Sequence, residues 1–353
     1  MTVAFEAIVG LLKELIATPS LSREEGDTAE VLTRFLIGQG VPVQRQGYNV
    51  WARSRQWDAE RPVLLLNSHH DTVKPNPSWQ REPFVPTVEG DRLYGLGSND
   101  AGGPLVSLIA TFLHFYDQAD LPWNLLLAAT AEEEISGPNG IAALLPELGP
   151  IDLAVVGEPT LMQPAIAEKG LMVIDGTAHG VAGHAAREEG VNAIYEALAD
   201  LAWLRDCQFE RVSEFLGPVK VSVTQIEAGT QHNVVPDLCR FVIDVRTNEL
   251  YSNEEAFAYL DAHTRSTLKA RSFRLNSSRL EPDHPVVERA LTLGLTPYGS
   301  PTLSDQALMP FPSLKIGPGD SARSHTADEY IGLSELREGI DLYIRLLEGL
   351  PLV

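Results

Sequence analysis

Residues 64–73 read LLLNSHHDTV and place a short apolar run directly before two imidazoles and a carboxylate. The run Val63–Asn67 predicts a strand that is buried on both faces of a parallel sheet. Because side chains alternate along extended backbone, His69 and Asp71 should point the same way and His70 the other way. In an α/β protein the carboxyl ends of such strands meet at one crevice. Alone, the segment is equally compatible with a polar loop that carries an incidental His-His pair.

Four further segments carry acidic or imidazole groups beside apolar runs. They are GLGSNDAGG (95–103), LLLAATAEEEISG (125–137), VVGEPT (155–160) and GPGDSARSHTADEY (317–330). Taken singly, Asp100 could be a helix N-cap, and three consecutive glutamates are usually a solvated helix face. Here, however, Glu133 and Glu134 follow a predicted core strand closely, where adjacent carboxylates repel unless a cation or a proton neutralises one of them.

Together these segments contain the ligand set of a two-metal hydrolytic centre. Two imidazoles and three carboxylates are expected to bind the metals: His69, Asp100, Glu134, Glu158 and His325. Asp71 is then available to orient a ligating imidazole, and Glu133 to deprotonate water. Core packing and helix capping do not account for five such groups at strand ends. The sequence therefore predicts a dinuclear metallohydrolase.

The pattern of apolar residues predicts an α/β fold with a mostly parallel sheet and helices on both faces. The first 170 residues alternate helices with short core strands such as 125–129 and 153–156. A capping-box pattern predicts that a helix begins at Ser22. The same helix-and-strand pattern resumes after Pro282, so we expect one domain built from residues 1–170 and 282–353.

An inserted lid domain is expected over residues 171–281. Its strands mix apolar and polar residues, and the order β-α-β-β-α-β is that of a split βαβ unit, an α+β sandwich with one open sheet face. The second helix is predicted at 253–268 and the last strand at 272–276.

Composition excludes some classes of partner. The 353 residues carry 48 acidic and 27 basic side chains, a formal charge of −21, which argues against nucleic acid and anionic membrane surfaces. The N-terminal segment is predicted to be an amphipathic helix and not a signal peptide. Cys207 and Cys239 have no metal-ligand or redox spacing and are expected to be free thiols in a reducing compartment. We expect a soluble cytoplasmic protein.

The order HxD…D…EE…E…H resembles that of the M20 metallopeptidase and deacylase family over essentially the whole chain. The motifs that carry it are SHHDTV, GSNDAGG, AEEEIS, VVGEPT and RSHTADEY. Within the family the chain is most similar to the acetylornithine deacetylase group, through VVGEPT and the stretch GHAAREEGVNAI. The resemblance implies a zinc-exopeptidase-like catalytic domain with an inserted lid.

The resemblance also implies a role for each residue of the centre. His69 and Glu158 would bind one zinc, Glu134 and His325 the other, and Asp100 would bridge them, with Co²⁺ able to substitute. Asp71 would orient His69, Glu133 would be the general base, and the bond Asp100–Ala101 would be a cis peptide. Many family members have Asp where this chain has Glu132, but Ile135-Ser136-Gly137 favours Glu133 as the base and Glu134 as the ligand.

Further residues are implied for the lid and the substrate. His184 matches a histidine that reaches the scissile carbonyl, commonly across a dimer interface, and Asn233 matches a substrate-contacting asparagine. His184 could instead be a solvated loop residue and Asn233 a turn residue. Arg246 and Arg323 are candidates for binding the substrate carboxylate.

The expected activity is removal of the N-acyl group from an N-acyl-α-amino acid, as by an acetylornithine deacetylase in arginine biosynthesis, by a homodimer that associates through the lid. N-acetylornithine, N-acetylcitrulline, N-acetyllysine and N-succinylornithine all fit the centre. A dipeptidase or a desuccinylase would use the same centre. A non-catalytic metal-binding scaffold is disfavoured because it would need neither Glu133 nor Asp71.

Overall fold

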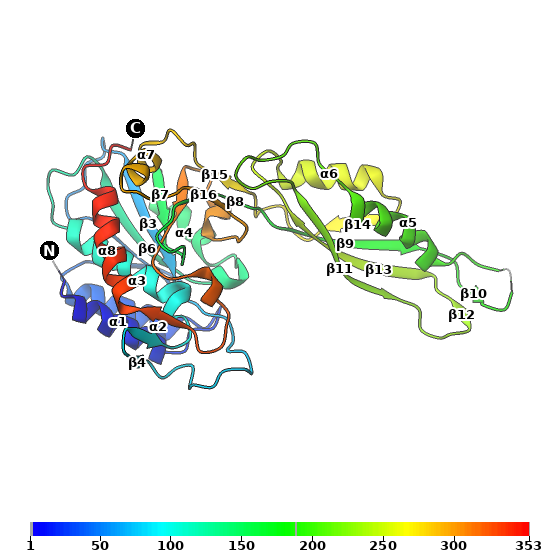
Figure 1. Cartoon of the computed structure of the whole chain (residues 1–353), viewed down its shortest axis with the longest axis horizontal. Helices are drawn as coiled ribbons and strands as arrows, with labels where there is room; N and C mark the ends of the chain where they lie inside the picture. Colours follow the sequence, from blue (N-terminus) through cyan, green and yellow to red (C-terminus); the bar gives the residue numbers. More distant parts are fainter. Residues whose placement is uncertain (1–2, 188, 353) are drawn as a thin grey trace. The chain divides into compact units, whose positions relative to one another are not determined.

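The computed structural model describes residues 3–187 and 189–352 (Figure 1). The chain forms two compact units. Unit 1 comprises Met1–Ile166, Leu280–Tyr298 and Ser304–Val353, and unit 2 comprises Ala167–Arg279 and Gly299–Leu303. The sequence places the boundaries after residues 170 and 281 and assigns the short segment 299–303 to the larger domain, whereas this segment clusters with unit 2. Residue 188, within GHAAREEGVNAI, lies outside the described residues.

The largest sheet has the strand order β1-β2-β6-β3-β7-β17-β8-β15, with β16 paired to β8. Its strands are β1 Gln44–Gln46, β2 Asn49–Arg53, β3 Val63–His69, β6 Asn124–Thr130, β7 Leu153–Val156, β8 Ala165–Glu168, β15 Ser278–Arg279, β16 Tyr298–Ser300 and β17 Ser313–Lys315. The central strands β6, β3, β7 and β17 are parallel, whereas β2 and β8 pair antiparallel with this group. The predicted α/β fold with a mostly parallel sheet is confirmed.

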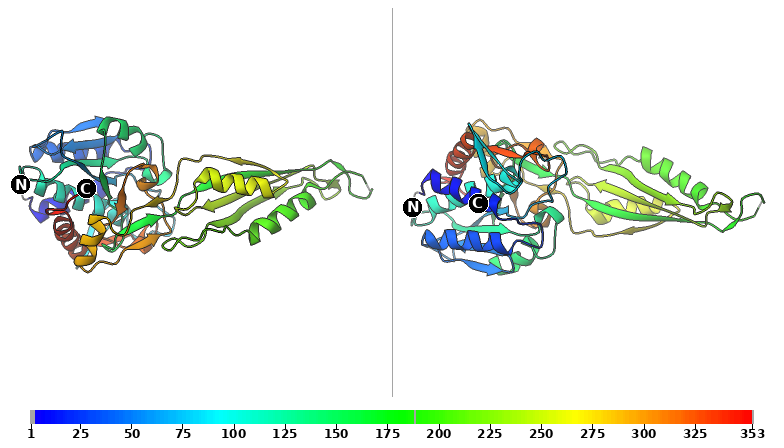
Figure 2. Two further views of the ribbon diagram at one scale, coloured as in Figure 1. Left: turned by 90° about the horizontal axis from the view of Figure 1, so that it is seen from above. Right: turned by 90° about the horizontal axis from the view of Figure 1, so that it is seen from below.

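Helices cover both faces of this sheet (Figure 2). On one face, Ile141 and Leu144 of α4 belong to the same buried cluster as Leu65 of β3. On the other face, Leu108 of α3 approaches Ser68 of β3, whose side chain points opposite to that of Leu65. The helices of unit 1 are α1 Phe5–Ala17, α2 Gly26–Gly38, α3 Gly103–Phe115, α4 Ile141–Leu148, α7 Pro285–Thr292 and α8 Leu333–Leu347.

The start of α2 corrects one prediction. The helix begins at Gly26, and the predicted cap, Ser22, lies outside it. Arg23 has a φ of 78°, a left-handed conformation that a right-handed helix cannot contain. The Ser22 hydroxyl instead donates a hydrogen bond to Asp71, so a tertiary contact has replaced the local cap.

Unit 2 contains a four-stranded antiparallel sheet of order β11-β13-β9-β14, with α5 and α6 on one side of it (Figure 1). The elements are β9 Met172–His179, α5 Ala193–Asp206, β11 Lys220–Ala228, β13 Leu238–Arg246, α6 Asn253–His263 and β14 Thr267–Ala270. This is the predicted β-α-β-β-α-β order. Ala197 of α5 and Leu260 of α6 pack with Ile174 and Phe241 of the sheet in one buried cluster.

Two boundaries in unit 2 differ from the predictions. Helix α6 ends at His263, because Thr264 adopts an extended conformation. The last strand is therefore β14 at Thr267–Ala270, and the predicted strand at 272–276 is irregular backbone. Short amphipathic runs such as TLKA are compatible with either a helix or a strand, so pairing with β9 decides the outcome.

Two smaller sheets are also present. One joins β4 (Thr87–Glu89), β5 (Arg92–Tyr94) and β18 (Tyr330–Gly332), and the other joins β10 (Gly183–His184) and β12 (Val234–Val235). Among the described helices, none combines the length and the apolar character that a membrane span requires.

Candidate metal centre

The predicted ligands of unit 1 gather at the carboxyl ends of the parallel strands. His69 is the last residue of β3, and Glu158 follows β7 by two residues. Glu133 and Glu134 form a short turn after β6. Asp100 lies in the segment that directly precedes α3. The strand order β6-β3-β7 makes these carboxyl ends neighbours, which explains how distant segments of the chain reach one place.

His69 faces one set of carboxylates. Its Nε2 lies 3.3 Å from Asp100 Oδ1, 3.7 Å from Glu133 Oε2 and 3.7 Å from Glu158 Oε1. The imidazole is 1% exposed, so these contacts are screened from water. The opposite nitrogen, Nδ1, faces Asp71, which leaves Nε2 as the nitrogen available for a metal.

His325 faces a second set of carboxylates. Its Nε2 lies 3.0 Å from Glu134 Oε2 and 3.7 Å from Asp100 Oδ2. Asp100 therefore directs one carboxylate oxygen towards His69 and the other towards His325. The peptide bond between Asp100 and Ala101 is cis, as the sequence predicts. This arrangement matches that expected of a carboxylate that bridges two metal ions.

The donor set fits divalent metal ions. Two groups of residues could each hold a metal ion, because the ligand atoms inside each group lie within 4.8 Å of one another. One group is His69, Asp100 and Glu134, and the other is His69, Glu133 and Glu158. Imidazole nitrogens combined with carboxylate oxygens suit zinc and other first-row divalent ions. Four of the five predicted ligands belong to these groups, together with Glu133, whereas His325 belongs to neither, and the role of each residue stays a prediction.

Without bound cations, the ionisable groups of the centre perturb one another's pKa values. Burial, together with the neighbouring Asp100 carboxylate, raises the pKa of Glu158 to about 8. Hydrogen bonding to Glu134 raises the pKa of His325 to about 9. Burial raises the pKa of Glu133 well above its ordinary value, and proximity to Glu158 adds to this. Cations placed among these groups would offset the repulsion that holds protons on the two glutamates and would compete with the proton that Glu134 holds on His325.

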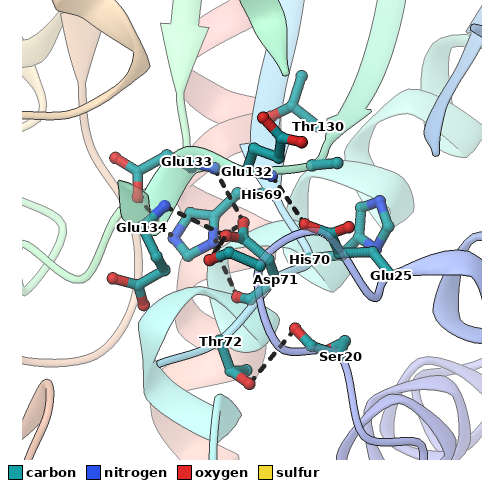
Figure 3. A network of polar contacts seen from close by, with 12 residues as sticks. Ser20, Glu25, His69, His70, Asp71, Thr72, Thr130, Glu132, Glu133 and Glu134 are labelled. Atoms are coloured by element: carbon teal, nitrogen blue, oxygen red, sulfur yellow. Dashed lines mark hydrogen bonds and ion pairs between the residues drawn. The ribbon is translucent and has the colours of Figure 1, made fainter. Parts of the chain in front are cut away.

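Asp71 connects both halves of the centre (Figure 3). Its carboxylate lies 3.3 Å from His69 Nδ1 and accepts hydrogen bonds from the backbone N–H groups of Glu133 at 3.1 Å and Glu134 at 3.2 Å. It also accepts the Ser22 hydroxyl at 2.7 Å. Asp71 thus contacts the glutamate turn as well as the imidazole that it was predicted to orient.

A family comparison agrees with this geometry. Residues 65–349 match the model of peptidase family M20/M25/M40. The chain belongs to this family. The matched residues extend from β3 to α8 and include every predicted metal ligand.

The M20 chain is similar to curated deacylases along almost its whole length. It is 30% identical to an acetylornithine deacetylase of Proteus mirabilis, covering 99% of this chain and 98% of that protein. It is 26% identical to a succinyl-diaminopimelate desuccinylase of Gluconobacter oxydans, covering 97% of each. The protein is therefore an M20 hydrolase.

Solved structures of peptidases share the fold. Aminopeptidase PepT from Bacillus cereus superposes with a TM-score of 0.78 at 19% identity, covering 98% of this chain and 99% of that one. A dinuclear metal binding peptidase of family M20 from Bacillus subtilis superposes with a TM-score of 0.73 at 16% identity, covering 97% of each chain.

The first glutamate of the triplet, Glu132, turns away from the M20 centre. Glu132 has a left-handed φ of 54°, and its carboxylate accepts hydrogen bonds from the side chain and the backbone of Asn139. Its own N–H donates to Glu25. Glu133 and Glu134 are thereby left facing the histidines, which agrees with the predicted register.

Sequence analysis missed two buried acids next to the centre. Glu329, four residues after His325, accepts three backbone N–H groups of the loop that carries Asp100. Asp305 accepts the Thr130 hydroxyl, and burial raises the pKa of its carboxyl to about 6. Glu329 stands within the motif RSHTADEY, but nothing in the motif indicates which loop its side chain contacts.

The predicted substrate residues are divided between the two units, with Arg323 in unit 1 and the other three in unit 2. His184 and Asn233 are exposed and adjoin β10 and β12 of unit 2, where the Asn233 carbonyl accepts the Ala185 N–H. Arg246 donates two hydrogen bonds to Asp244 in unit 2, at 2.8 and 3.0 Å. Arg323, in unit 1, donates two to Glu335, at 2.7 and 2.9 Å. Their roles in binding substrate stay predictions.

Proposed function

We propose that the protein is a two-metal N-acyl-α-amino acid deacylase, of the acetylornithine deacetylase type, that acts in arginine biosynthesis. The observation that carries the proposal is Asp100, which presents one oxygen to each histidine beside the largely enclosed Glu133. The near full-length similarity to an acetylornithine deacetylase supports the choice of an acylated amino acid as the substrate. The free thiols Cys207 and Cys239 support a cytoplasmic location.

Each residue then has a chemical task. His69 and Glu158 would hold the first metal, Glu134 and His325 the second, and Asp100 would contact both. Zinc, or cobalt in its place, supplies Lewis acidity that lowers the pKa of water and polarises the acyl carbonyl. Glu133 accepts the proton of the attacking water and returns it to the leaving amine, a task suited to a carboxylate that lies beside His69 in the centre.

Unit 2 is proposed to act as the lid and to contribute to the site. His184 donates a hydrogen bond to the developing oxyanion, and Asn233 contacts the substrate. The α-carboxylate requires a cation, for which Arg246 and Arg323 are the candidates, and each must share its guanidinium with the carboxylate that now binds it. The substrates that remain open are N-acetylornithine, N-acetylcitrulline, N-acetyllysine and N-succinylornithine.

The lid is also proposed to form a homodimer. Strand β11 is a nine-residue edge strand, and α5 contacts it. Ile226 on this edge and Leu198 on α5 are 58% and 54% exposed. A long edge strand that adjoins exposed apolar side chains is a surface on which another chain can pair.

The register of that pairing can be specified. A bulge between Val223 and Gln225 interrupts the alternation of side chains, so that the residues after it face the opposite side of the sheet from the one that strict alternation would give. Antiparallel pairing of two copies about an axis next to Val223 would set Lys220 opposite Glu227 of the second copy. Both of these side chains project to the sheet face away from the helices, because each pairs with an arginine of β13 on that face. The edge is thus complementary to itself in charge.

The assembly can be tested by light scattering. The wild-type protein should have twice the chain mass of 38.5 kDa, and Ile226→Asp should halve the measured mass. Ile37→Asp, which alters a similarly exposed isoleucine of α2, is the matched control and should stay dimeric. A monomeric wild-type protein would refute the dimer.

The activity is tested by amine release from the four acyl amino acids and a simple dipeptide, using Zn²⁺- or Co²⁺-loaded protein. Hydrolysis of an acetylated basic amino acid that Glu133→Gln abolishes without loss of metal would support the proposal. Cleavage of the dipeptide alone would favour the alternative of an M20 dipeptidase. Preference for a succinyl substrate would favour a desuccinylase, the activity named for several relatives. If Glu133→Gln changed nothing, a scaffold role would follow.

A further inference from the structure

The loop that carries Asp100 is held from outside the predicted ligand set. Its residues Gly97, Asn99 and Asp100 direct their backbone N–H groups at the Glu329 carboxylate, at 3.0, 2.8 and 2.9 Å. Glu329 is 2% exposed, so this carboxylate has little access to water. Three N–H groups that converge on one buried carboxylate restrain both the position and the orientation of a short loop.

This contact continues a pair of strands. Strands β5 and β18 pair with Tyr94 opposite Tyr330, and the Gly95 N–H extends the ladder to the Glu329 carbonyl. The loop leaves β5 at the point where Glu329 enters β18. The ladder therefore delivers the Glu329 side chain to the loop, and the loop in turn presents Asp100.

A second contact links the same loop to the segment that carries His325. The Asn99 side chain donates to the Asp320 carbonyl at 3.1 Å and accepts the Asp320 N–H at 3.0 Å. Asp320 lies five residues before His325. The Glu329 and Asn99 contacts thus join the segments that hold Asp100 and His325, which lie 3.7 Å apart at their side chains.

We propose that Glu329 and Asn99 are positioning residues that set the Asp100 carboxylate relative to His325. The proposal rests on the proposed two-metal function. A bridging carboxylate must present two oxygens to two ions at once, so a small rotation of its backbone would weaken both contacts. Asp100 has one short side chain with which to meet this demand, and its backbone N–H is bound to Glu329.

The decisive variant is Glu329→Gln, which keeps the shape but turns an amide NH₂ towards backbone N–H groups. In the metal-free protein, exchange of the amides of residues 97–100 should accelerate at least about tenfold. The visible spectrum of the Co²⁺-loaded protein should change. The kcat should fall about 10- to 100-fold with KM within about threefold, because ligand geometry is lost and substrate contacts are kept.

Asp200→Asn is the matched control. Asp200 is a buried carboxylate of unit 2 that accepts the backbone N–H groups of Arg265 and Ser266. Its substitution should lower thermal stability and leave the Co²⁺ spectrum and the amide exchange of residues 97–100 unchanged. A Glu329→Gln protein that exchanges faster but keeps the wild-type Co²⁺ spectrum and kcat would overturn the proposal, since Glu329 would then only stabilise the loop.

Asn99→Ala decides the matter if Glu329→Gln does not fold. It removes the link to Asp320 and keeps the three N–H bonds to Glu329, so the Co²⁺ spectrum should again change. An unchanged spectrum would overturn the proposal. The spectra do not depend on the substrate: a wild-type protein that binds two Co²⁺ but hydrolyses nothing would refute the proposed function and still allow this comparison.

Discussion

Loading the metal-free protein with zinc should release protons, and the minimum number follows from two side chains, Glu158 and His325. With pKa values of about 8 for Glu158 and about 9 for His325, about nine-tenths of the first and nearly all of the second are protonated at pH 7. A ligand must give up its proton to bind the metal. Although burial lowers the pKa of His69, the neighbouring Glu133 carboxylate helps to raise it well above its ordinary value, so this ligand must also lose its proton. We therefore expect at least about two protons to be released at pH 7 and fewer at pH 9.

The sign of the pH dependence follows. Because bound metal and bound protons exclude each other at both residues, affinity rises with pH. Near pH 7, a rise of one pH unit should strengthen metal binding by roughly 100-fold, and this gain should fade above about pH 9. Acidification should empty the centre for the same reason.

Calorimetric titration in buffers of different ionisation enthalpy counts the protons directly. His325→Asn should lower the count by about one. His114→Asn, on α3, is the control and should leave the count unchanged, since burial lowers the pKa of His114 and keeps it neutral. If the heat of metal binding at pH 7 did not depend on the buffer, no protons would be released, which would refute the raised pKa values of Glu158 and His325.

Three further predictions concern single residues. Asp71→Asn should lower metal affinity and kcat by about 10- to 100-fold, as measured by chelator competition and steady-state kinetics, because the amide keeps only one of the two acceptor oxygens that face the imidazole and the glutamate turn. Gly176→Ala should cost about 1–3 kcal/mol in urea unfolding, since its Cβ would lie 2.2 Å from the Phe241 ring; unchanged stability would contradict the packing. Gly10→Ala, at an open position inside α1, should instead stabilise by about 0.5–1 kcal/mol in the same assay.

The sequence revealed the centre because its ligands stand at the ends of strands with strong patterns. His69 and Glu158 could be placed from the apolar runs that precede them, and the order of parallel strands then made them neighbours. Glu329 could not be found in this way, because its contacts depend on the pairing of β18 with β5. Ser22 was misassigned for a related reason, since its hydroxyl binds Asp71, 49 residues away, and not the adjacent helix.

The position of β17 in the sheet has a consequence for how the chain matures during synthesis. Ser313–Lys315 lies between β7 and β8, which are made more than 140 residues earlier. The sheet therefore lacks the strand that joins β7 to β8 until the C-terminal part leaves the ribosome. Ala167–Arg279 is contiguous and can fold while that part is still being made. His325 is the last of the predicted ligands to be synthesised. A nascent chain that stops before it would thus hold four of the five predicted ligands without forming a complete centre, which would delay the capture of metal.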